Sequence, residues 1–183
     1  MQPANPPARL IAAQPLARAD FLPYGDLVCA GEQPGTPINA GGAQRFDDLT
    51  RLDFDDGGGA ACLAIFRTGA AMDAGALALH AFERHCLGSQ TFVPLGAGRC
   101  LCIVAGGGDA PNEAAIRAFI VEPGQGVTLR RGVWHHPLIT LGAADVLVIE
   151  RRAAHVDCDI HPITSRIMVT VDGIPGGSNH ETR

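Results

Sequence analysis

The chain has 183 residues, enough for one domain, and 46% of them are hydrophobic, which suits a packed core. Its formal net charge is −5, and its basic residues are all arginines that lie singly or in pairs. Binding to a phosphate backbone needs a clustered positive face, so we expect no nucleic-acid partner. No secretory signal and no run of about 18 apolar residues is visible, so we expect a cytoplasmic protein without a membrane partner.

Turn residues divide the chain into a central domain and two loose ends. Residues 1–14 are expected to form a loose N-terminal arm, residues 15–172 a single barrel domain and residues 173–183 a flexible C-terminal tail. Short apolar runs, spaced roughly 8–12 residues apart, are typical of a sandwich or barrel. The expected strands are residues 27–30, 62–67, 77–85, 92–95, 100–105, 118–121, 126–129, 146–150 and 166–171. Only short helices are expected, at residues 17–25 and 112–117.

The cysteines lie in apolar segments without C-x-x-C spacing. This distribution favours reduced thiols in a cytosolic protein over a disulfide framework. The residues are Cys29, Cys62, Cys86, Cys100, Cys102 and Cys158.

The segment 77–85 alternates apolar and polar side chains and is expected to be one strand. Its odd positions begin apolar and end at Glu83 and His85, like a strand that runs from a core into a pocket. On a strand these two side chains would lie about 7 Å apart on the same face, from a rise of about 3.3 Å per residue. Both could therefore reach one atom in a cavity.

Two polar motifs are present, one that begins at the end of this segment and one further along the chain. Glu83, His85 and Gln90 form E-x-H-x4-Q, which parallels the first cupin motif, and Gly132 and His135 form G-x-x-H, which parallels the second. The pair predicts a mainly β, cupin-like double-stranded β-helix, or jelly-roll barrel, with few short helices. Adjacent His135 and His136 face opposite ways on a strand, and the spacing favours His135 in the pocket.

These side chains offer donors for a divalent metal, nickel or zinc, with His85, Gln90 and His135 as the expected ligands. Both metals favour more nitrogen ligands than this set supplies, so a metal-free site of the same residues stays open. A purely structural polar network is the further alternative, but buried Glu and His side chains are costly for packing alone.

Other polar segments carry weaker signals. Asn39 and Arg45 lie in one loop, where the guanidinium could clamp a substrate carboxylate or simply face solvent. The alternating polar residues 155–161 resemble a metal cluster but are more typical of an exposed strand face. Ser89 lies outside any G-x-S-x-G elbow, so it is not expected to be a nucleophile.

Several segments together resemble the ureidoglycolate lyase family of the allantoin pathway, over roughly residues 15–165. The segments are ERHCLGSQTFVPL at 83–95, RGVWHHP at 131–137, INAGGAQRF at 38–46, IFR at 65–67, GDAP at 108–111 and RAF at 117–119. The resemblance implies a cupin-like homodimer that splits the small molecule ureidoglycolate into glyoxylate and urea in purine catabolism. The match at residues 158–161 is only partial, and the chain after residue 165 does not align.

By this resemblance the expected catalytic residues are Glu83, His85 and His135, which would act by acid–base elimination. The residues expected to bind substrate are Asn39, Arg45, Ser89, Gln90, Trp134 and His136. The family has also been called a hydrolase, so an amidohydrolase that releases ammonia stays an alternative, as does another small-molecule cupin enzyme. A ligand-sensing cupin module is disfavoured because no helix-turn-helix or basic segment accompanies the domain.

Overall fold

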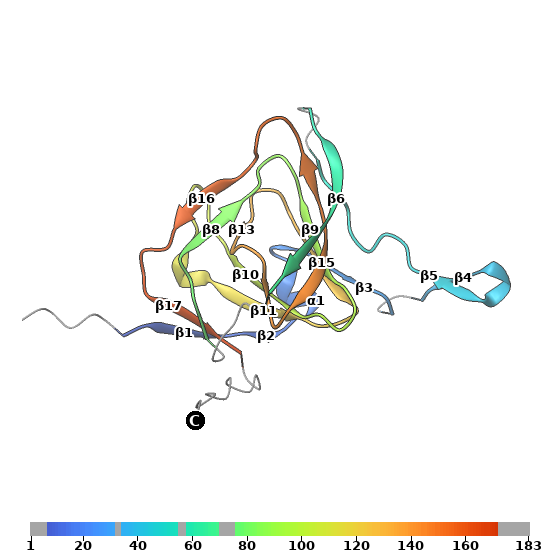
Figure 1. Cartoon of the computed structure of the whole chain (residues 1–183), viewed down its shortest axis with the longest axis horizontal. Coiled ribbons are helices and arrows are strands. Elements are labelled where there is room, and N and C mark those ends of the chain that lie inside the picture. The colour runs from blue at the N-terminus through green and yellow to red at the C-terminus, as the bar shows by residue number, and fades with distance from the viewer. Residues whose placement is uncertain (1–6, 32–33, 55–57, 70–75, 172–183) are drawn as a thin grey trace, which may run out of the picture.

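The computed structural model describes residues 7–31, 34–54, 58–69 and 76–171, and Figure 1 shows its layered sheets. Its helices are short: α1 covers Arg18–Phe21, and the 3-10 turns η1 and η2 cover Asn39–Gly41 and Glu113–Ala115. The prediction of a mainly β fold with few short helices is confirmed. No helix in the described ranges is long and apolar enough to cross a membrane.

Three sheets form the body of the molecule. The cover sheet has the order β1 (Arg9–Ala12), β17 (Ile167–Thr170), β7 (Ala76–Ala78). The middle sheet has the order β16 (Asp159–Pro162), β8 (Ala81–Arg84), β13 (Trp134–His135), β10 (Cys100–Ala105), β11 (Arg117–Val121), β2 (Gln14–Pro15), and β14 (Ile139–Thr140) pairs with β10. The five-stranded sheet has the order β3 (Gly25–Cys29), β12 (Gln125–Leu129), β9 (Gln90–Pro94), β15 (Ala144–Arg152), β6 (Ala60–Thr68).

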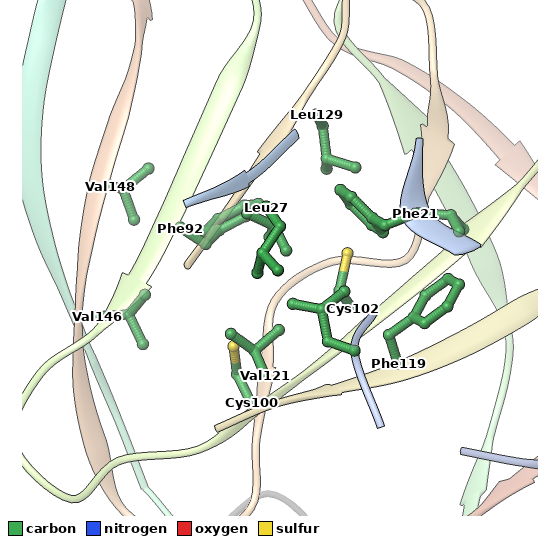
Figure 2. Close-up of a cluster of buried hydrophobic side chains, with 13 residues drawn as sticks. Phe21, Leu27, Phe92, Cys100, Cys102, Phe119, Val121, Leu129, Val146 and Val148 are labelled. Atoms are coloured by element: carbon green, nitrogen blue, oxygen red, sulfur yellow. The ribbon is translucent and has the colours of Figure 1, made fainter. Parts of the chain in front are cut away.

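The middle sheet is apolar on both faces because a separate core packs against each. Strand β10 is a continuous apolar run, and its alternate residues enter different cores. Cys100, Cys102 and Val104 pack with side chains of the five-stranded sheet, such as Phe92 and Val148, in the first core (Figure 2). The second core lies on the other face, toward the cover sheet. On β8 and β13, side chains at alternate positions therefore face either the first core or the second core.

The segment predicted as one strand over residues 77–85 is instead two strands in different sheets. The backbone leaves the cover sheet at Leu79, whose N–H donates to the Ile167 carbonyl at 3.0 Å, and enters the middle sheet at Ala81. Because of this change of sheet, odd-numbered residues before and after Leu79 do not lie on one common face. Leu77 and Leu79 pack with Phe82 in the second core, so the predicted common face of Leu77, Leu79 and Glu83 is wrong.

Residues 9–12 and 14–15 form strands that pair with the sheets, whereas residues 1–14 were expected to form a loose arm. Strand β1 runs parallel to β17, and β2 runs parallel to β11. Ile11 packs beside the second core, which gives this segment apolar contacts as well as backbone hydrogen bonds. The predicted tail, residues 173–183, lies outside the described residues, as do residues 1–6.

The loop that carries Asn39 and Arg45 forms a hairpin that projects from the sheets (Figure 1). Its strands are β4 (Thr36–Ile38) and β5 (Ala43–Arg45), and η1 makes the turn between them. Asn39 has φ 53°, a left-handed conformation that asparagine tolerates better than most residues.

All six cysteines are free thiols, as predicted. Cys102 is buried, and burial raises the pKa of Cys100 to about 12. The thiolate is the reactive form, so we expect a maleimide reagent to label exposed Cys86 in the native protein, and Cys100 and Cys102 only after unfolding. Mass spectrometry of digested, labelled protein measures this order. Labelling of Cys102 in native protein as fast as Cys86 would contradict the described core.

Candidate functional site

Glu83 and His135 are directly opposed residues on the antiparallel strands β8 and β13. Directly opposed residues project from the same face of a sheet, which places both side chains toward the five-stranded sheet. His135 Nε2 lies 3.5 Å from Glu83 Oε1, and the imidazole is almost completely buried. Strand pairing therefore brings together two residues that are far apart in the sequence.

His85 completes a three-residue cluster. It follows the last residue of β8, and its ring centroid lies 5.3 Å from that of His135. One donor atom from each of Glu83, His85 and His135 lies within 4.8 Å of the other two. The sequence prediction that Glu83 and His85 can reach one atom agrees with this geometry.

Backbone carbonyls fix the protonation of both imidazoles. His85 Nδ1 bonds to the carbonyl of Asp157, and His135 Nδ1 bonds to that of Val133 at 3.0 Å. A carbonyl oxygen only accepts, so Nδ1 of each neutral ring must carry the proton. Each Nε2 therefore presents a lone pair to the cluster, and neither has a hydrogen-bond partner within the described parts of the chain.

Glu83 is held as a carboxylate. Burial is the largest single influence and would raise its pKa, but His135, which donates to it when protonated, the charge of a protonated His85 and the Cys158 thiol together lower the pKa below its ordinary value. The Cys158 thiol lies 3.7 Å from Glu83 Oε2 and also stabilises the anion. Burial raises the pKa of Cys158 itself, with the neighbouring Glu83 adding to the effect, so the sulfur stays a thiol that can donate.

A cavity of about 180 Å³ opens beside this cluster, and its walls include His85 and Gln90. The Gln90 side-chain N–H₂ donates to Glu150 Oε2 at 2.8 Å, which fixes the amide orientation. Gln90 Oε1 is buried and has no partner in the described ranges. His85 and Gln90, which line the cavity, thus each carry a buried acceptor without a partner among the described residues, His85 Nε2 and Gln90 Oε1.

The loop after β15 forms another wall of the cavity. The Asp157 carboxylate accepts from the amides of Cys86 at 2.9 Å and Leu87 at 2.7 Å. These bonds fasten the loop to the end of β8, and the same loop supplies the carbonyl that orients His85. Asp157 therefore positions His85 through both its side-chain carboxylate and its backbone carbonyl.

Of the residues predicted to bind substrate, Gln90 and Ser89 line the cavity. Ser89 Oγ already accepts a hydrogen bond from the Asp53 amide at 2.9 Å, so it also ties neighbouring segments together. Gln90 was further predicted as a metal ligand, and its unpartnered Oε1 is the atom available for that contact.

Trp134 lies on the opposite face of the middle sheet from His135, and His136, which follows β13, contacts Phe82 of the second core. Trp134 packs in the second core, its N–H donates to the Gly108 carbonyl at 3.0 Å, and the Arg84 guanidinium lies 4.5 Å above its ring. The His136 ring meets Phe82 edge-on at 6.3 Å, and burial lowers its pKa. Neither residue lines the cavity beside His85, which strand alternation explains for Trp134.

Asn39 and Arg45 lie on the projecting hairpin, and the described residues that line the cavity include none from it. Arg45 Nε forms an exposed ion pair with Asp47 at 2.7 Å. The predicted carboxylate clamp is therefore not assembled inside a single chain, because the turn that carries it points away from the sheets (Figure 1).

Several residues around the cavity were not assigned to the site from the sequence, and four of them carry its polar contacts or charges. They are Glu150, Arg151, Asp157 and Cys158. Glu150 had a usable signal, because it ends an inward apolar alternation after Val146 and Val148, as a strand that reaches a pocket should. Asp157 and Cys158 fall in the polar run predicted as an exposed strand face, whereas only its last part is strand, in β16.

Comparison with known proteins agrees with the resemblance seen in the sequence. The model of the ureidoglycolate lyase family matches residues 8–170. A ureidoglycolate lyase of Pseudomonas putida (strain W619) is 36% identical over 165 residues, 90% of this chain and 98% of the relative. That of Burkholderia mallei (strain NCTC 10229) is 40% identical over 144 residues, 78% of this chain and 83% of the relative. On this match the chain belongs to the ureidoglycolate lyase family.

Proposed function

We propose that the protein is a lyase that cleaves ureidoglycolate into glyoxylate and urea. Family membership gives the substrate, and one observation in the site carries the chemistry: the unpartnered Nε2 atoms of His85 and His135 face the ionised Glu83. Elimination needs a group that removes the hydroxyl proton and a proton for the departing nitrogen. A cluster of proton acceptors beside a cavity meets the first need directly.

In the reaction, the hydroxyl of ureidoglycolate loses its proton as the C–O bond becomes the carbonyl of glyoxylate. The C–N bond breaks, its electron pair goes to the nitrogen, and that nitrogen takes a proton to give urea. We assign proton removal to His85, because His85 lines the cavity. Glu83 and His135 then stabilise the imidazolium, which returns the proton to the urea nitrogen. Gln90 Oε1 accepts from a ureido N–H and orients that group.

The cluster also fits a divalent metal such as nickel or zinc. Metal-bound imidazoles usually donate their other ring N–H to a backbone carbonyl, and both His85 and His135 do so here. A metal held by Glu83, His85 and His135 would supply Lewis-acid stabilisation of the developing alkoxide. Metal analysis of the purified chain decides whether these imidazoles serve as ligands or as proton acceptors.

The product distinguishes the lyase from the amidohydrolase alternative. Purified full-length protein supplied with ureidoglycolate is expected to release one urea per glyoxylate, because elimination breaks the C–N bond to the reacting carbon and leaves the ureido group intact. Urea and ammonia are measured in the same samples by coupled assays. Ammonia formed in step with glyoxylate, without urea, would contradict lyase chemistry, and no turnover would contradict the function.

We further propose a homodimer that works in cytoplasmic purine catabolism. Free thiols suit a reducing compartment. Among the described strands, β6 is an edge of the five-stranded sheet, with Leu63 67% and Ile65 49% exposed, and such an edge favours pairing with another chain. Antiparallel pairing of β6 with its own copy is two-fold symmetric, as a homodimer contact requires.

Replacing Leu63 with glutamate is expected to produce monomers, because the added charges would meet across the two-fold contact. Leu10 is equally exposed at 67% but lies on β1, so Leu10→Glu is the matched control and should stay dimeric. Sedimentation equilibrium compares these masses with the 19.0 kDa of one chain. A monomeric wild type, or a dimeric Leu63→Glu variant, would rule out this contact.

A further inference from the structure

Arg151 lies beside the cavity that contains the proposed catalytic residue His85. It is the second-last residue of β15, and it lines the cavity together with His85 and Gln90. Its Nη2 donates to the carbonyl of Gly58, which anchors one side of the fork.

Glycines make room for this side chain. A Cβ placed on Gly59 would lie 2.7 Å from Arg151 Nε, and one placed on Gly88 would lie 2.6 Å from Arg151 Cβ. Both distances are too short for ordinary side-chain contacts, so any other residue at these positions would displace the arginine. The backbone thus approaches Arg151 closely on two sides and restricts its rotamers.

Arg151 Nε is a buried N–H donor without an acceptor among the described residues. Two carboxylates that line the same cavity hydrogen-bond to other groups: Glu150 accepts from Gln90, and Asp157 accepts from the amides of Cys86 and Leu87. A buried charged donor without a partner is costly, so a ligand that supplies an acceptor gains from this site. Planar bidentate recognition by arginine suits a carboxylate best.

We propose that Arg151 binds the carboxylate of ureidoglycolate and of the glyoxylate formed from it. This inference rests on the proposed function and assigns the clamp to Arg151 of the same chain rather than to Arg45 on the hairpin. With the carboxylate at Arg151, the hydroxyl can face His85 and the ureido group can face Gln90. Arg151 then fixes which substituent of the reacting carbon meets the base.

The test is the binding of glyoxylate and of its neutral amide to the full-length protein, measured by calorimetry. In Arg151→Gln the dissociation constant for glyoxylate should rise about 10- to 100-fold, as expected for loss of a charge-assisted hydrogen bond. Binding of the amide should change less than about threefold, because the amide has no charge to lose. Arg151→Lys keeps the charge but not the fork, so its glyoxylate affinity should fall between those of wild type and Arg151→Gln.

Two controls separate this role from others. Arg99→Gln is the first control. Arg99 precedes β10, at the opposite end of that strand from His135, and pairs with Glu122, so this variant should bind glyoxylate like the wild type. Equal weakening of glyoxylate and amide in Arg151→Gln would indicate a merely structural role and overturn the proposal. Loss of glyoxylate binding in Arg45→Gln, with Arg151→Gln unaffected, would also overturn it. Because binding is measured without turnover, a failure of the lyase assignment is seen separately, as absence of urea from wild-type protein.

Discussion

Replacing His135 with alanine is expected to lower the rate of urea release from ureidoglycolate by about 10²- to 10⁴-fold, the usual contribution of a positioned acid–base group. His135 opposes Glu83 across the strand pair and turns its Nε2 toward the cluster, so its loss removes a partner of both other members. His85→Ala should have an effect of the same order. Steady-state kinetics of folded, purified variants measures both.

His136→Ala is the matched control for this prediction. It removes the same side chain from the adjacent position, but the His136 ring packs edge-on against Phe82 of the second core, and His136 does not line the cavity beside His85. The folded variant should keep kcat within a few-fold of wild type, although its stability should fall. Near-normal activity in His135→Ala, or equal losses at both positions, would contradict the assigned cluster.

Trp134→Ala is expected to destabilise the fold by about 3–5 kcal/mol, the usual cost of deleting a large buried aromatic side chain. Trp134 is 2% exposed and packs in the second core, where it also donates to Gly108 and lies beneath Arg84. Denaturant titration followed by circular dichroism measures the change in the free energy of unfolding, since the variant lacks the only tryptophan of the chain.

The same variant tests the role that the sequence analysis gave to Trp134. If it is a core residue, the protein that remains folded should bind ureidoglycolate with a KM close to the wild-type value. Phe in place of Trp should recover part of the lost stability, because an aromatic ring again fills the space. Wild-type stability combined with a strongly raised KM would instead support the predicted contact with substrate.

The central cluster was predictable because strand geometry constrains it tightly. Glu83 and His85 lie two residues apart at the end of a strand, and a two-residue spacing turns both to one side. Strand alternation allows only one of His135 and His136 to face the pocket, the G-x-x-H spacing favours His135, and the structure pairs His135 directly with Glu83. Local periodicity and motif order were sufficient for these residues.

Contacts between distant segments were not predictable in the same way. The change of sheet at Leu79 leaves no break in hydrophobicity, because both halves of the segment bury apolar side chains in the second core. Nothing in the local pattern of Asn39 and Arg45 tells whether their hairpin folds onto the sheets or away from them. Arg151 directly follows the strand predicted over residues 146–150, and the local sequence does not reveal that it lies beside the cavity, where Gly59 and Gly88 approach it closely.

A crystal structure of the full-length protein with glyoxylate would test most directly where the chemistry occurs. We expect glyoxylate in the cavity, within hydrogen-bond distance of His85 Nε2 or bound to a metal that His85 holds. A separate depression of about 410 Å³ is lined by Arg51, Arg130 and Arg131. Glyoxylate bound there, or on the hairpin, with the cavity beside His85 occupied only by water, would contradict the assignment of the active site.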